Sequence, residues 1–132
     1  MTRTYTYDYD NLRYFPSAPV LDLHIFSPDM VENVQTVTAM VDTGSDTTVL
    51  PIKILEEIGA QMTRMVTLRG IYDGRHSNRL YRVAVRIGDY TINKVEVASS
   101  ANPNHVVVGR DVVNHLVMTL DGPVGVTSIT SE

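Results

Sequence analysis

The chain has 132 residues, with 15 acidic and 11 basic side chains and a formal net charge of −4. This length is typical of one domain with a modest core of its own. The basic side chains are scattered along the chain, so we expect no nucleic-acid partner. Because the sequence contains no cysteine, it excludes a disulfide framework and a zinc–thiolate site.

Residues 1–10 contain no apolar stretch like that of a secretory signal, and no apolar run reaches the length of a membrane span. We therefore expect no contact with a membrane. A chain without cysteine fits a reducing compartment, which predicts a cytoplasmic location.

The first 17 residues alternate tyrosine with polar residues and end in Phe15-Pro16. This N-terminal arm, 1–17, is either an exposed segment or edge strand, or a dimer contact made through its aromatic side chains. Apolar alternation then predicts strands over 20–26 and 34–41, separated by a Ser-Pro-Asp turn at 27–29.

Pro51 and Gly59 bracket an apolar periodicity that indicates a short helix, since proline favours the first position of a helix and glycine the position after its end. Two β-like runs, 62–69 and 80–87, are joined by a glycine-bracketed tip and predict a hairpin. Further strands are expected over 90–98 and 106–108, an apolar segment follows at 117–120, and residues 122–132 form a tail. These short strands predict an all-β fold, with the main domain over 18–121.

The most informative motif is an apolar run, 39–41, that ends in Asp42-Thr43-Gly44-Ser45. The apolar run places the carboxylate of Asp42 on a low-dielectric floor, where the charged form is costly and a proton can be shared. Gly44 lets the backbone approach both this carboxylate and a bound chain. Ser45 can donate a hydrogen bond to the same carboxylate. A turn aspartate is the plain alternative, because Asp-x-Gly is also ordinary turn chemistry.

A second motif, Val106 to Asp111, consists of three valines followed by Gly-Arg-Asp. It predicts a buried strand, a glycine break and a short helix with Asp111 in its first turn. With both motifs present in this order, the chain resembles the retropepsin-like aspartic proteases over roughly residues 18–121. The resemblance implies an all-β, closed-barrel architecture with a short helix after the Gly-Arg-Asp motif.

The resemblance also implies an aspartic endopeptidase with Asp42, Thr43 and Gly44 as its catalytic motif. Because the chain has one such motif and no internal repeat, a homodimer must supply two Asp42 carboxylates. Two facing carboxylates cannot both ionise easily, so they share a proton and activate a water molecule between them. The implied partner is an extended polypeptide, bound by strand addition between the paired floor and the flaps.

Further site residues follow from the same resemblance. Asp46 and Arg110 are expected to form an ion pair that fixes the Asp42 loop, although two unrelated surface charges are the alternative. The glycine-bracketed tip resembles a flap over the bound peptide, with a plain solvent-exposed hairpin as its alternative. The expected substrate-binding residues are Ser45, Asp46, Val49, Gly70, Ile71, Tyr72, Asp73, Gly74 and Val107.

No metal or cofactor is expected, because the four histidines are far apart in the sequence and show no ligand spacing. A rival hypothesis is a catalytically weak domain of this fold that serves for dimerisation or peptide binding. The Asp-Thr-Gly-Ser sequence at 42–45 favours the enzyme, and hydrolysis of a denatured protein discriminates the two.

Overall fold

The computed structural model describes residues 2–70 and 74–131 of the chain. In chain order its elements are β1 (Arg3–Asp8), β2 (Val20–Ser27), β3 (Met30–Val41), β4 (Val49–Pro51), α1 (Ile52–Glu57), β5 (Gln61–Gly70), β6 (Gly74–Ile87), β7 (Tyr90–Ser100), β8 (Val107–Val108), α2 (Arg110–Val113), β9 (Val117–Asp121) and β10 (Val126–Ser131). The all-β prediction is therefore confirmed, with two short helices among the described residues.

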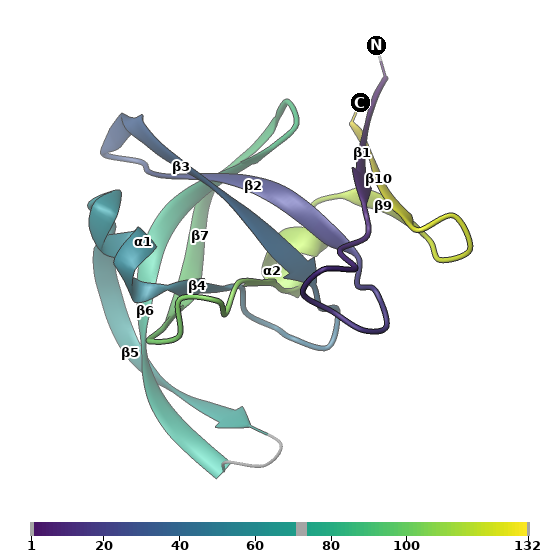
Figure 1. The fold of residues 1–132 in the computed structure, drawn as a ribbon. Coiled ribbons are helices and arrows are strands. Elements are labelled where there is room, and N and C mark those ends of the chain that lie inside the picture. Colours follow the sequence, from purple (N-terminus) through teal and green to yellow (C-terminus); the bar gives the residue numbers. More distant parts are fainter. Residues whose placement is uncertain (1, 71–73, 132) are drawn as a thin grey trace.

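Seven strands form one sheet in the order β2-β3-β8-β4-β7-β6-β5. An additional antiparallel pairing joins β2 to β6, in the register Ile25 to Val85. This pairing closes six of the strands into a barrel and leaves β5 on its outer side, paired with β6 (Figure 1). Closure pairs the six barrel strands with one another, so that β5 is left as the edge strand of this sheet.

The core of the barrel is aliphatic and follows the period of two that a strand imposes on its side chains. In β2, for example, Leu21, Leu23 and Ile25 are fully buried, while the residues between them are half-buried. The helix α1 closes one end of the core with Leu55 and Ile58. It follows Pro51 and is terminated by Gly59, whose φ of 71° is accessible to glycine at little cost.

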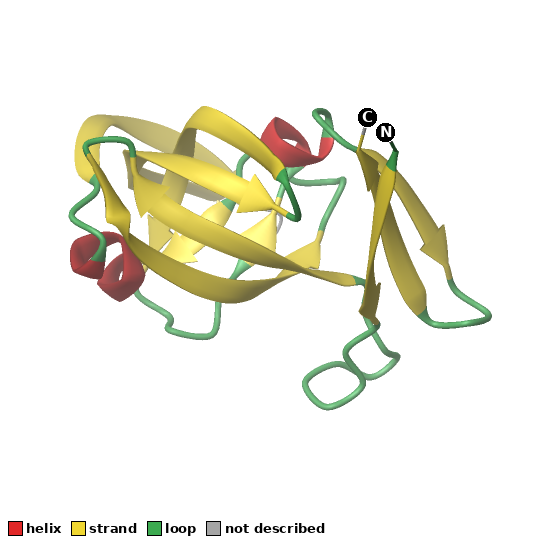
Figure 2. Cartoon of the chain, turned by 90° about the horizontal axis from the view of Figure 1, so that it is seen from above, coloured by secondary structure: helices red, strands yellow, loops and turns green. Residues whose placement is uncertain are grey.

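A second, three-stranded sheet has the order β1-β10-β9 and stands beside the barrel, with both chain ends at one side (Figure 2). Tyr5 of β1 packs on the turn between β6 and β7, where a Cβ added to Gly88 would lie 2.5 Å from the tyrosine ring. Arg3 also pairs with Asp89 of that turn at 3.6 Å. These contacts hold the small sheet against the barrel.

The sequence predicted most of these elements within a few residues but treated 122–132 as a tail. In the structure β10 lies in the middle of the three-stranded sheet, between β1 and β9. The N-terminal arm contributes β1 to the same sheet, which agrees with the expectation of an added edge strand. The arm and the tail thus pair with each other rather than extending from the domain.

Candidate active site

Asp42 follows the last residue of β3, at one end of the barrel. Its backbone N–H donates to the carbonyl of Val108 at 3.0 Å, and the N–H of Val41 donates to the carbonyl of Pro19 at 2.9 Å. The side chain is half-buried, and its Oδ1 accepts a hydrogen bond from the N–H of Gly44 at 2.9 Å. The carboxylate is therefore oriented by its own loop, within a turn that any larger residue than glycine would crowd.

The loop that carries Asp42 lies directly against the start of α2. The N–H of Arg110 donates to the carbonyl of Ser45 at 2.8 Å. A Cβ added to Gly109 would lie 2.8 Å from that carbonyl oxygen and 2.8 Å from the carbonyl carbon of Thr47. Real Cβ atoms essentially never approach backbone so closely, so glycine at this position permits the contact. The glycine break predicted from the second motif is the point where the two motifs meet.

A buried hydrogen-bond network joins the far end of the loop to α2. The carboxylate of Asp111 accepts from the Thr48 N–H at 2.9 Å and from the Thr48 hydroxyl at 2.7 Å. The N–H of Gly109 donates to the same hydroxyl at 3.1 Å. Thr48 is fully buried, so these bonds satisfy polar groups that have no access to water. The sequence analysis missed this pairing, although an Asp in the first turn of the second-motif helix was its visible signal.

Two expected contacts of this loop are not formed among the described residues. Arg110 does not pair with Asp46: its Nη1 donates to the carbonyl of Thr43 at 2.7 Å, and the Asp46 carboxylate accepts from the Thr47 hydroxyl at 3.2 Å. The Ser45 hydroxyl donates to the carbonyl of Thr47 at 2.7 Å rather than to Asp42. In both cases the loop brings a backbone carbonyl close to the donor, and the donor binds this carbonyl instead of the expected carboxylate. Arg110 still holds the Asp42 loop, because its side chain binds the backbone carbonyl of Thr43.

The remaining predicted substrate-binding residues are spread over the barrel end and the β5–β6 hairpin. Val49 is half-buried and Val107 is buried, and the two are paired across β4 and β8 beside Asp42. Gly70 and Gly74 face each other at the ends of β5 and β6. Ile71, Tyr72 and Asp73, the predicted tip, lie outside the described residues. Their contact with a substrate stays a prediction.

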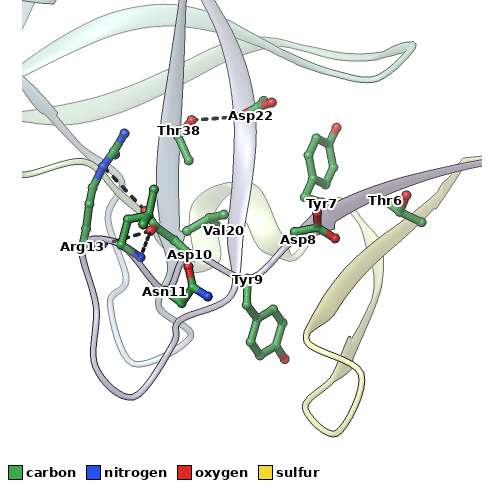
Figure 3. Close-up of a pocket in the computed structure, with 11 residues that line it drawn as sticks. Thr6, Tyr7, Asp8, Tyr9, Asp10, Asn11, Arg13, Val20, Asp22 and Thr38 are labelled. Atoms are coloured by element: carbon green, nitrogen blue, oxygen red, sulfur yellow. Dashed lines mark hydrogen bonds and ion pairs between the residues drawn. The ribbon is translucent and has the colours of Figure 1, made fainter.

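A cavity of ≈ 460 Å³ lies between the N-terminal segment and the outer side of β2 and β3 (Figure 3). Its lining includes Asp10, Asp22 and Tyr7, and it does not include Asp42 or the described residues of its loop. Burial raises the pKa of Tyr7, and the charge of Asp22 raises it further. This hollow is therefore distinct from the candidate active site.

Among the described residues, no three histidine or carboxylate side chains gather in a way that could hold a metal ion. No helix in the described part of the chain is both long and apolar enough to cross a membrane.

Comparison with known proteins identifies the family to which the chain belongs. The family model described as aspartyl protease matches residues 29–112, which contain both motifs. No curated protein sequence matches the chain.

Three solved structures are among those that share the fold. A retropepsin-like aspartic protease from Rickettsia conorii aligns with a TM-score of 0.67 and 11% identity, over 98% of this chain and 92% of that one. The EIAV protease, solved with the inhibitor HBY-793, aligns with a TM-score of 0.57 and 20% identity, over 80% and 91%. The simian foamy virus (mac) protease aligns with a TM-score of 0.52 and 17% identity, over 72% and 91%. On the family match and this shared fold, the chain belongs to the retropepsin-like aspartyl protease family.

Proposed function

We propose that the protein is an aspartic endopeptidase that acts as a homodimer, with one Asp42 from each copy. The observation that carries this proposal is the position of Asp42. It ends a core strand, and its Oδ1 is held by the N–H of Gly44 in a loop that α2 secures from the other motif. A half-buried carboxylate fixed in this way suits acid–base chemistry, because its geometry is set before a substrate binds.

The chain contains a single Asp-Thr-Gly motif, so a two-carboxylate site needs a second copy. When two carboxylates face each other at close range, one proton is shared between them, as is established for aspartic protease dyads. The exposed Thr43 and Gly44 beside Asp42 leave room for such an approach. The proposal of a homodimer rests on the need for a second carboxylate, which one chain does not supply.

In the proposed reaction, the ionised Asp42 takes a proton from a water molecule held between the two carboxylates. The water oxygen bonds to the carbonyl carbon of the scissile peptide, while the protonated Asp42 of the other copy gives its proton to the carbonyl oxygen. The carbon–nitrogen bond of the resulting diol then breaks: the leaving nitrogen takes a proton from one Asp42, and a diol hydroxyl gives a proton to the Asp42 of the other copy. This step restores the dyad with its single shared proton. The products are a carboxylic acid and an amine, and no cofactor enters the balance.

The substrate in this proposal is an extended polypeptide that lies across the two Asp42 loops. The β5–β6 hairpin supports binding of such a chain. Its outer strand β5 is paired only with β6, and the side chains of β5 over 61–65 are exposed. Such a strand can add a further chain by backbone hydrogen bonds. The cytoplasmic location expected from the sequence stays a prediction.

Hydrolysis of a denatured protein, with fragments identified by mass spectrometry, tests the proposal across a pH series. Asp42→Asn should reduce the rate by at least about 100-fold, which is the scale of losing an acid–base group, without changing the thermal unfolding. Asp29→Asn is the matched control, since its carboxylate is exposed in the turn between β2 and β3, at the other end of β3 from Asp42. Excess Asp42→Asn protein should also inhibit the wild-type protein through mixed dimers.

Hydrolysis that survives in Asp42→Asn would overturn the proposal. Peptide binding without hydrolysis, equal in the wild type and in Asp42→Asn, would instead establish the rival function of a peptide-binding domain.

A further inference from the structure

The loop of residues 11–17, between β1 and β2, exposes two large apolar side chains. Leu12 is 94% exposed and Phe15 is 101% exposed, the highest values for large apolar side chains among the described residues. Single exposed apolar residues are common on soluble proteins. Two of them on one short loop, both fully in water, offer apolar area that contact with another molecule would remove from water.

The loop that carries these side chains is hydrogen-bonded within itself. Asp10 and Ala18 exchange backbone hydrogen bonds at 2.9 and 3.1 Å across its base. Within the loop, Oδ1 of Asp10 accepts from the N–H of Leu12 at 2.9 Å and from the N–H of Arg13 at 3.1 Å (Figure 3). The apolar side chains therefore stand on a defined turn, which lowers the ordering cost when a partner binds.

The base of this loop lies beside the catalytic strand. The carbonyl of Pro19 accepts from the N–H of Val41, the residue before Asp42, at 2.9 Å. Phe15 is three residues from Ala18, so the Cα atoms of these two residues are no more than roughly 11 Å apart. Figure 1 shows the loop turning next to the end of β3. The loop that carries the exposed apolar side chains thus leaves the barrel beside the strand end that bears Asp42.

We propose that the loop of residues 11–17 is a docking surface for a second copy of this chain, with Leu12 and Phe15 buried in the dimer that completes the active site. This inference rests on the proposed function, because one chain supplies one of the two carboxylates. A second Asp42 cannot approach the first unless the surfaces around both are brought together. In a symmetric dimer each copy contributes its own loop to the interface, so two leucine and two phenylalanine side chains would be buried there.

Sedimentation velocity over a concentration series tests the inference by measuring the dimer Kd. Leu12→Ser/Phe15→Ser should raise this Kd at least about tenfold, since truncating buried apolar anchors is costly and each change occurs twice in the dimer. Val31→Ser is the matched control, because Val31 is 60% exposed at the far end of β3. Val31 lies ten residues before Val41, roughly 33 Å along the strand. The dimer Kd of Val31→Ser should therefore stay within about twofold of the wild-type value.

Two further measurements separate dimerisation from folding and catalysis. The thermal unfolding of dilute, monomeric double variant should match that of dilute wild type, because both side chains are already in water. A tandem chain, two double-variant copies joined by a Gly/Ser linker, should regain activity through high effective concentration.

A double variant whose Kd equals that of the wild type would overturn the inference. A double variant that dimerises normally but has a higher KM would also overturn it, and would place the loop against the substrate instead. Failure of the proposed function gives a different result: the wild type dimerises and cleaves nothing, while the ultracentrifugation still decides whether the loop docks a second copy.

Discussion

The Asp42 loop (42–48) and the loop of residues 11–17 are neighbours at one end of the barrel, yet they are held in different ways. The Asp42 loop is fixed by residues more than sixty positions away in the sequence, Gly109, Arg110 and Asp111. The loop of residues 11–17 is fixed by its own Asp10 and by one bridge to Ala18.

This difference suits the two roles proposed for the loops, positioning a carboxylate and docking a second copy. A catalytic carboxylate needs a defined position, and contacts from a distant element of the rigid barrel supply it. A docking loop needs a defined shape but can change its exposed residues without disturbing the core, because its contacts are local. Substitutions at 109–111 should therefore damage the active site from a distance, whereas substitutions in the other loop should act locally.

The largest effect is expected for Gly109→Ala. The new Cβ would meet backbone atoms of Ser45 and Thr47 at 2.8–2.9 Å, and backbone cannot rotate away as a side chain can. We expect the free energy of unfolding to fall by roughly 1–3 kcal/mol, the usual cost of overpacking, together with a loss of peptidase activity. Chemical denaturation of the purified variant measures the first quantity.

Gly122→Ala is the matched control for this substitution, because nothing lies within 4 Å of a Cβ added there. It should change neither stability nor activity. Equal stability of Gly109→Ala and Gly122→Ala would mean that the Asp42 loop is not packed on α2, and the contrast between the two loops would disappear.

An effect of similar size on stability is expected at the Thr48–Asp111 pair, which lies farther from Asp42 along the loop. Asp111→Ala leaves the buried N–H and hydroxyl of Thr48 without their acceptors, which should cost about 1–3 kcal/mol in the free energy of unfolding. Asp111→Asn should cost less, because its amide oxygen can still accept from one of the two donors. Asp46→Ala removes an exposed carboxylate of the loop and should change stability by no more than about 0.5 kcal/mol. The reverse order, with Asp46 the more costly residue, would restore the ion pair expected from the sequence.

Much of this site could be predicted from the sequence, because its signals are local. An apolar run before Asp42 indicates a carboxylate at the end of a buried strand, and Gly109 between a valine run and a helix indicates a break between these two elements. The barrel closure and the position of α2 follow from the resemblance that these two motifs carry. The partners of Ser45 and Arg110 could not be predicted, because several acceptors lie within reach and the path of the loop selects among them.

The strand β10 shows another limit of sequence patterns. Its inward positions are Thr127 and Ile129, which are 0% and 1% exposed, and its other residues are mostly serine and threonine. A buried threonine hides the alternation of apolar and polar residues by which a half-buried strand is recognised. The hydroxyl of Thr127 has no hydrogen-bond partner among the described residues. A polar side chain is therefore buried here without such a partner, and a sequence pattern would place such a residue on the exposed face.

The smallest effect is expected at Asp10, the residue directly before the loop of residues 11–17. The hydrogen bond from the N–H of Arg13 is the main cause that lowers the pKa of this carboxyl. Burial, the next largest cause, raises this pKa, and the Leu12 N–H and the Arg13 charge lower it. A pKa that is lower in the folded chain means that ionised Asp10 stabilises the fold above the unfolded pKa. This contribution is lost as the pH falls through the folded pKa.

Asp10→Asn should therefore be slightly less stable than the wild type at neutral pH, and the difference should vanish in acid. The amide oxygen of asparagine can still accept from the two N–H groups, so this variant isolates the charge, whereas Asp10→Ala removes the acceptor and should be the less stable of the two. Thermal unfolding across a pH series measures the stability difference, and a carboxyl NMR titration measures the pKa itself. If the gap between wild type and Asp10→Asn stayed constant down to acid pH, ionised Asp10 would not be what holds the loop, and its shape would depend on the Asp10–Ala18 bridge alone.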